Sequence, residues 1–187
     1  MTIRVTRFVM AAALTLAVPG AAQRGGSFEA GAFARYTRFD NSLGVGNAIG
    51  AGGRLAVFLR PNVAVELDVA RTSSDRPGGA AVTHSPLHAR LTYYYQTPGS
   101  ARVDVLVGAG LVRNKYSGAY TATDHGLAVL VGVRYRWNDR IGARLDANED
   151  FVTSPANETP QVTYNSNFAV HVGVSVLFDW RRSAARR

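Results

Sequence analysis

The chain has 187 residues, no cysteine, a formal net charge of +8 and a charged fraction of only 18%. The lack of cysteine excludes disulfide bridges and thiolate metal sites, and the arginines are scattered singly, which argues against a nucleic-acid-binding surface. Although 47% of the residues are hydrophobic, no segment after the start of the chain has the roughly 20 consecutive apolar residues of a membrane-spanning helix.

Residues 1–22 have the three parts of an export signal. Arg4 and Arg7 give a positive start, and an apolar stretch runs from Phe8 to Val18. Gly20 and Ala22 then suit the −3 and −1 positions of a cleavage site. Because the apolar stretch is too short for an uncleaved anchor, we predict a Sec-type signal peptide over residues 1–22.

From Phe28 onward the dominant pattern has a period of two. In the segment 63–70, for example, valine and leucine alternate with Ala64, Glu66, Asp68 and Ala70. Such alternation is typical of strands with two different faces. The same reasoning predicts eight strands, near residues 28–39, 49–59, 63–70, 87–96, 102–109, 127–137, 141–148 and 168–180.

Short and long links alternate between these segments. Tight links lie around Pro61, Pro98 and Asp139, whereas the other four links are longer and polar. Barrels of the bacterial outer membrane have short periplasmic turns and long extracellular loops. We therefore predict an all-β fold over residues 23–180, an eight-stranded antiparallel up-and-down transmembrane β-barrel. Its long loops are expected at residues 40–47, 72–86, 114–124 and 153–165.

One face of the predicted strands is almost purely apolar and the other carries charges of both signs. A soluble barrel would need the apolar face inside, whereas a membrane barrel turns it towards lipid. The charged set is too large for a dry core, so we expect it in the lumen. Buried charges must be paired, and an arginine–carboxylate network is predicted. Its expected members are Glu29, Arg35, Arg54, Glu66, Asp68, Arg90, Arg102, Asp104, Arg134, Arg136, Arg144, Asp146 and His171.

Aromatic residues gather at the strand ends that adjoin the tight links. In membrane barrels, such residues form girdles at the two membrane–water interfaces. We predict that one interfacial girdle consists of Tyr93, Tyr95, Tyr135, Trp137, Phe178 and Trp180.

The segments 28–40, 52–61 and 65–68 resemble the opening of OmpA/OprF-type outer-membrane barrel domains. The aromatic-rich last strand is similar to a barrel-assembly signal, although the basic tail 181–187 follows Trp180. The resemblance implies a bacterial outer-membrane location, contact with membrane lipid and lipopolysaccharide, and insertion by the barrel-assembly machinery. We expect no peptidoglycan-binding domain after the barrel. Arg71, Arg76, Arg113 and Lys115 are expected in the external loops, where they either pair with lipopolysaccharide phosphates or are solvated loop charges.

We expect a monomer with a structural or surface-interaction role, without enzymatic activity, cofactor or metal. Eight strands leave an interior that side chains just fill. Three alternatives stay open. The first is a narrow pore, gated by inward pairs around Arg54, Glu66, Arg134 and Asp146. The second is a lipid-modifying enzyme, for which His84-Ser85 offers a histidine and a hydroxyl but no legible orienting acid. The third is a soluble ligand-binding barrel.

Overall fold

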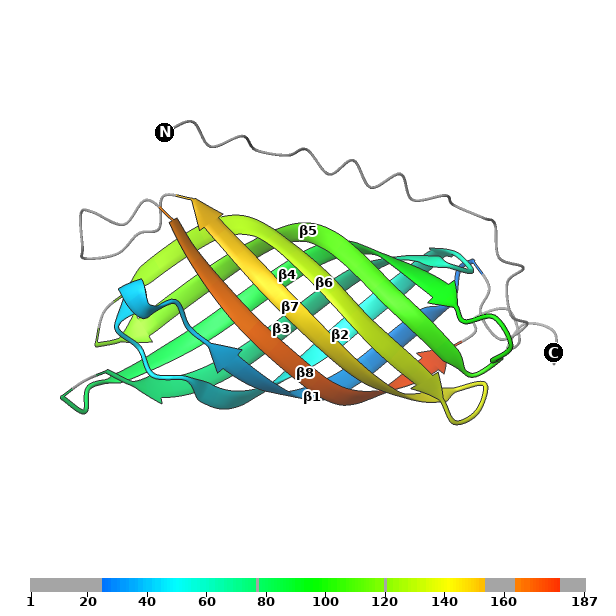
Figure 1. Cartoon of the computed structure of the whole chain (residues 1–187), viewed down its shortest axis with the longest axis horizontal. Helices are drawn as coiled ribbons and strands as arrows, with labels where there is room; N and C mark the ends of the chain where they lie inside the picture. Colours follow the sequence, from blue (N-terminus) through cyan, green and yellow to red (C-terminus); the bar gives the residue numbers. More distant parts are fainter. Residues whose placement is uncertain (1–24, 77, 120, 154–163, 179–187) are drawn as a thin grey trace, which may run out of the picture.

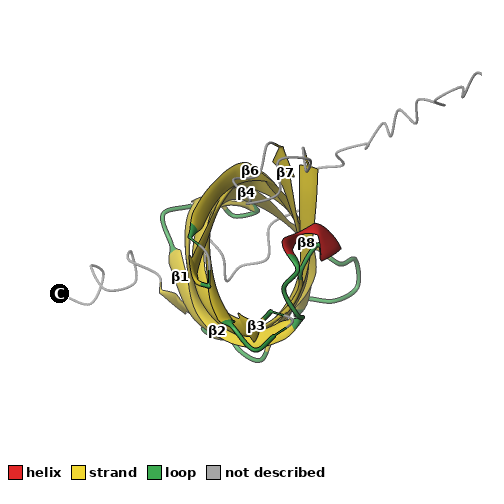
Figure 2. Cartoon of the chain, turned by 90° about the vertical axis from the view of Figure 1, so that its left-hand side faces the viewer, coloured by secondary structure: helices red, strands yellow, loops and turns green. Residues whose placement is uncertain are grey.

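The computed structural model describes residues 25–76, 78–119, 121–153 and 164–178. The predicted signal peptide, the basic tail 181–187 and Trp180 lie outside these ranges. Eight antiparallel strands close into a barrel (Figures 1 and 2), which confirms the predicted fold class. The strands are β1 (Phe28–Arg38), β2 (Ala48–Arg60), β3 (Val63–Asp75), β4 (Ala81–Gln96), β5 (Val103–Gly118), β6 (Ala122–Arg136), β7 (Ile141–Thr153) and β8 (Tyr164–Phe178).

Each strand pairs with its neighbour in sequence, and β1 pairs with β8 to close the ring. Phe28 of β1 lies opposite Phe178 of β8, so the two terminal strands meet at one end of the barrel. We call this the turn end, because it also carries links 61–62, 97–102 and 137–140. The opposite end is the loop end, which faces the viewer in Figure 2. Within the described ranges, no helix is long and apolar enough to cross a bilayer.

The alternating sequence pattern places apolar side chains on the outside of the barrel. Ile49 is 75% exposed, Leu111 63% and Leu127 61%. The residues between them point inward and include most of the buried polar and charged side chains. This arrangement is the reverse of a soluble barrel, which hides its apolar face. The outer surface therefore matches a lipid environment, as the sequence pattern predicts.

Two of the four predicted long loops are wrong. The predicted loop 72–86 is largely strand, because β3 extends to Asp75 and β4 begins at Ala81. The predicted loop 114–124 shrinks to residues 119–121 between β5 and β6. The turn-end link 97–102 is longer than that, so the strict alternation of short and long links fails. The strands continue beyond the apolar band, where both of their faces are polar. The hydrophobic alternation therefore ends there, although the hydrogen bonds between the strands continue.

The loop between β1 and β2 folds over the loop end of the barrel. It contains the short 3-10 helix η1 (Asn41–Leu43), next to β8 in Figure 2. Leu43 and Val45 are buried and join an apolar cluster with Phe39, Val82 and Tyr116. These contacts cover part of the lumen with apolar side chains.

Candidate functional site: the charged lumen

The inward face of the barrel carries a dense set of buried charges. Of the thirteen expected lumen residues, eleven are buried: Glu29, Arg35, Arg54, Glu66, Asp68, Arg90, Asp104, Arg134, Arg144, Asp146 and His171. Arg136 is partly buried at the turn-end rim, 3.4 Å from Asp104. The expectation for Arg102 is wrong. It is exposed, because β5 begins only at Val103 and the chain bends before it.

The network nearest the turn end is centred on Arg134. Its guanidinium lies 2.6 Å from a Glu29 carboxylate oxygen and 2.7 Å from one of Asp104. Its Cζ atom also lies 4.5 Å from the centre of the Tyr94 ring, close enough for a cation–π contact. The Tyr94 ring belongs to an apolar cluster that occupies this part of the lumen, formed by Ala56, Phe58, Ala64, Tyr94, Leu106 and Leu130.

The middle of the lumen is organised by Arg144. Its two terminal nitrogens donate to the two oxygens of Glu66 at 2.7 and 3.1 Å, a bidentate pair. Its Nε donates to Asp146 at 2.7 Å, and Asp146 also pairs with Arg54 at 2.8 Å. The hydroxyl of Tyr94 donates to Glu66 as well. Charge-assisted bonds of this kind offset the desolvation of buried ions.

A third cluster, closer to the loop end, surrounds His88. Its two ring nitrogens lie 2.7 Å from Asp68 and 2.8 Å from Asp150. A ring that donates to a carboxylate at both nitrogens is an imidazolium. Arg90 donates to the other oxygen of Asp68 and to Asn148, whereas Arg35 is 3.7 Å from Asp150.

A charged His88 also balances the lumen. The buried carboxylates of the described residues are those of Glu29, Glu66, Asp68, Asp104, Asp124, Asp146 and Asp150. These seven carboxylates face seven cations if His88 is counted as an imidazolium. The cations are Arg35, Arg54, His88, Arg90, Arg134, Arg136 and Arg144.

Sequence reasoning missed part of this site. His84, His88, Asp124 and Asp150 are buried but were not among the expected lumen residues. Successive residues of a strand point to opposite faces, so residues an even number of positions apart share a face. His84 and His88 share the inward face with Arg90, and Asp150 shares it with Asp146, so the alternation could have predicted these positions. The Nε2 atom of His84 donates to the Asn114 side-chain oxygen at 3.0 Å. His84 points into the barrel whereas Ser85 lies on the opposite face of β4, so the two do not form a catalytic pair.

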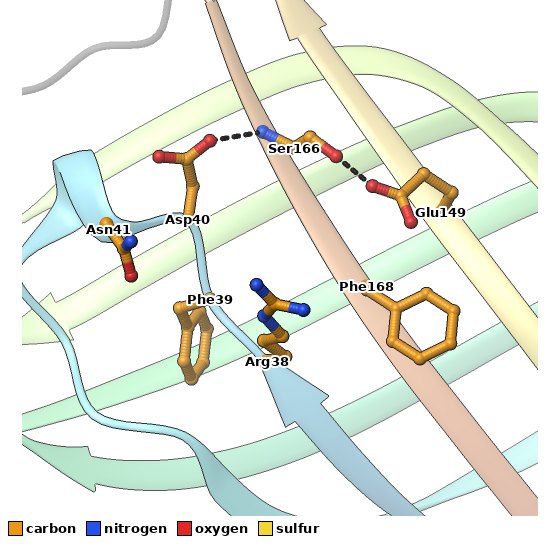
Figure 3. Close-up of a pocket in the computed structure, with 7 residues that line it drawn as sticks. All are labelled: Arg38, Phe39, Asp40, Asn41, Glu149, Ser166 and Phe168. Atoms are coloured by element: carbon orange, nitrogen blue, oxygen red, sulfur yellow. Dashed lines mark hydrogen bonds between the residues drawn. The ribbon is translucent and has the colours of Figure 1, made fainter.

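The outer wall at the loop end has a cavity of about 480 Å³ where β1, β7 and β8 meet (Figure 3). The Asp40 carboxylate accepts hydrogen bonds from the backbone N–H of Ser42 at 2.9 Å and of Ser166 at 3.0 Å. The Ser166 hydroxyl donates to Glu149. The polar groups of this cavity thus attach the β1–β2 loop to β8. Among the described residues, no group of three His, Asp or Glu side chains could hold a metal ion.

Five of the six aromatic residues expected in a girdle lie on the outer wall, and the sixth, Trp180, is outside the described residues. Tyr135, Trp137 and Phe178 are exposed, Tyr93 and Tyr95 half-buried, and all five are near the turn end. The Phe178 ring stacks on Phe28 with centroids 4.6 Å apart.

Comparison with known proteins identifies a matching family and similar solved structures. The outer membrane protein beta-barrel domain family matches residues 8–176. No curated protein sequence matches the chain. Three similar solved structures are the outer membrane protein OprG from Pseudomonas aeruginosa (16% identity, TM-score 0.58), Neisserial surface protein A (19%, 0.60) and the N-terminal β-barrel domain of Pseudomonas aeruginosa OprF (17%, 0.58). They cover 83%, 82% and 83% of this chain, and 97%, 97% and 99% of their own. The likeness to OprF agrees with the family resemblance of the sequence.

Proposed function

Because this chain belongs to the outer membrane protein β-barrel domain family, we propose that it is a structural or surface-interaction protein whose lumen is closed. The observation that carries the proposal is the cross-lumen network. Arg134 of β6 reaches Glu29 of β1, and Arg144 of β7 reaches Glu66 of β3. These bonds connect strands that are not neighbours in the barrel wall, so they fill the interior instead of lining it.

Apolar groups on both sides of the network support a closed lumen. The cluster around Phe58 and Leu106 lies towards the turn end, and the cluster around Leu43 and Tyr116 towards the loop end. An ion that crossed the barrel would have to pass both clusters and break buried ion pairs between them. Breaking a buried pair leaves an uncompensated charge, at about 3–5 kcal/mol.

The proposed setting is the bacterial outer membrane, entered after removal of the signal peptide 1–22. The exposed apolar wall and the aromatic side chains at the turn end support contact with lipid and an interfacial girdle. A closed ring leaves no free strand edge in the described part of the barrel, and free edges are where strands of separate chains associate. This supports a monomer, inserted by the barrel-assembly machinery.

Single-channel recording in planar lipid bilayers tests the closed lumen. We expect the folded, purified chain to give no conductance steps above those of the protein-free membrane. A channel-forming porin in the same membranes serves as the positive control. Steady conductance from the folded chain would contradict a closed barrel.

A narrow gated pore is the second candidate, favoured by loose contacts within the network. Arg54 lies 3.9 Å from Glu66 and 3.8 Å from Asp68, and neither terminal nitrogen of Arg35 has a hydrogen-bond partner. Such arginines could exchange carboxylates and open a path. In that case the recordings would show brief openings, and an Arg54→Gln variant would change their frequency.

A further inference from the structure

The outer wall has an uneven distribution of charge at the loop end. On β5, the outward residues from Val103 to Leu111 are apolar, and Arg113 and Lys115 follow directly. Arg71 follows the outward apolar run of β3, and His125 precedes that of β6. All four side chains are exposed. Arg71, Arg113 and His125 are thus the first outward polar residues beyond the apolar bands of their strands. Lys115 is the second such residue on β5.

The strand register brings these four side chains into one patch. Arg113 lies directly opposite His125, and Lys115 opposite Ser85. Between the pairs Val69↔Leu87 and Thr72↔His84, Arg71 falls opposite the same Ser85. Two strand spacings, about 10 Å, therefore separate Arg71 from Lys115, and two residues, about 7 Å, separate Lys115 from Arg113. We name Arg71, Arg113, Lys115 and His125 the basic patch.

Nothing in the described wall neutralises the basic patch. Among the described residues, Arg71, Arg113 and Lys115 take part in no ion pair. The exposed carboxylate on the same wall segment, Asp75, lies four residues beyond Arg71, about 13 Å further along β3. Adjacent like charges repel, so an unpaired cluster of this kind favours an anionic ligand.

The height of the patch indicates where that ligand lies. Ten residue steps separate Val103 from Arg113. With about 3.3 Å per residue and a strand tilt of about 40°, they span about 25 Å along the barrel axis, the thickness of the apolar band of outer-membrane barrels. Two exposed leucines adjoin the cations: Leu111 lies two residues nearer the turn end than Arg113 on β5, and Leu87 lies directly opposite Arg113 on β4. A ligand here would have acyl chains on the leucines and anionic groups on the patch.

We propose that the basic patch binds the phosphate groups of a phosphorylated lipid of the outer leaflet, of the lipid A type. Arg71 and Arg113 can each bind a phosphate through two N–H groups. Lys115 adds a point charge and His125 a ring N–H donor. This inference rests on the proposed outer-membrane function and assigns to one side of the barrel a defined lipid partner.

The test measures binding of diphosphorylated lipid A, and of the same lipid without phosphates, to the full folded chain in uncharged detergent micelles. The Arg113→Gln/Lys115→Gln variant should lose about thirtyfold in affinity for the diphosphorylated lipid, the change that about 1 kcal/mol per cation at an anionic membrane surface implies. The matched control, Arg60→Gln/Arg140→Gln, removes two exposed arginines at the turn end and should change affinity less than about twofold.

Equal losses in the two double variants, or no loss in either, would overturn the proposal. Equal affinity for the phosphate-free lipid would do the same. Inorganic phosphate that bound as tightly as the lipid would also overturn it, since the patch would then be a general anion site. Folding of each variant is checked by its heat-dependent gel mobility. A closed, non-conducting barrel that fails these binding tests would leave the proposed function intact and remove the lipid site alone.

Discussion

At the scale of single residues, the lumen is held by side chains whose removal leaves a buried charge alone. Replacing Arg144 by methionine keeps the volume but takes the guanidinium away from Glu66 and Asp146. We expect a loss of about 3–5 kcal/mol in the free energy of unfolding, measured by urea titration in lipid vesicles. Arg140→Met, at an exposed turn position, should change the free energy by less than about 0.5 kcal/mol.

The double variant Arg144→Met/Glu66→Met separates charge from packing. It removes a cation and an anion together, so it should be more stable than Arg144→Met alone. A double variant that is less stable than the single one would show that the pair does not carry this part of the stability.

Glycine makes room for the network at Gly132. A Cβ atom there would collide with the Asp146 carboxylate that Arg144 and Arg54 bind. We expect Gly132→Ala to lower the free energy of unfolding by about 1–3 kcal/mol, the usual effect of overpacking. Gly53→Ala is the control on the outer wall, where the nearest atom to an added Cβ is 3.7 Å away. Comparable losses in the same urea titration would contradict this explanation.

The composition of the lumen was largely predictable from the sequence, but its pairing was not. Alternation alone places Glu66 and Arg144 on the inward face. It does not show that residues 78 positions apart meet, because that depends on the stagger of all intervening strands around the ring. His88 was missed for a related reason. A histidine without a visible partner reads as an isolated group until the register brings Asp68 and Asp150 to its two nitrogens.

At the scale of elements, the strand centres followed from the sequence and the strand ends near the loops did not. Outward Val, Leu and Ile mark the part of each strand that faces lipid. Above it, β4 continues through Thr83 and Ser85, and β5 through Arg113 and Lys115. A strand in that region meets water outside and polar groups inside, so its composition resembles that of a loop.

The attachment of the β1–β2 loop to β8 depends on Asp40. Burial raises the pKa of this carboxyl, but the N–H groups of Ser42 and Ser166 more than offset that effect and lower it below the usual value. A lowered pKa stabilises the folded state above the unfolded pKa near 3.8, and the contribution is lost as the pH falls through the folded value. The loop should therefore remain attached at neutral and mildly acidic pH.

Asp40→Ala should loosen the part of the loop next to β8 at neutral pH. We expect faster amide hydrogen exchange in residues 41–44, with little change in β4 and β5, measured by mass spectrometry. Asn41→Ala, an exposed neighbour in the same loop, is the control and should leave exchange unchanged. If Asp40→Ala exchanged at the wild-type rate, the two hydrogen bonds to its carboxylate would not be what holds the loop.

At the scale of the whole molecule, the two ends of the barrel differ, and this difference predicts its orientation. The turn end carries both terminal strand ends and the three short links, whereas the loop end carries the basic patch and the folded β1–β2 loop. An exported chain whose termini remain in the periplasm must place the turn end there. The basic patch would then meet the outer leaflet, where the proposed lipid partner resides.

Cysteine labelling in intact cells tests this orientation directly, because the chain has no cysteine of its own. Ala80→Cys introduces a thiol in the β3–β4 link at the loop end, and Ala101→Cys introduces one in the β4–β5 link at the turn end; both positions are exposed. A membrane-impermeant maleimide should label the first variant in intact cells and the second only after the outer membrane is opened. The reverse pattern would invert the barrel and place the basic patch on the periplasmic leaflet, where a lipid A-type ligand is not available to it.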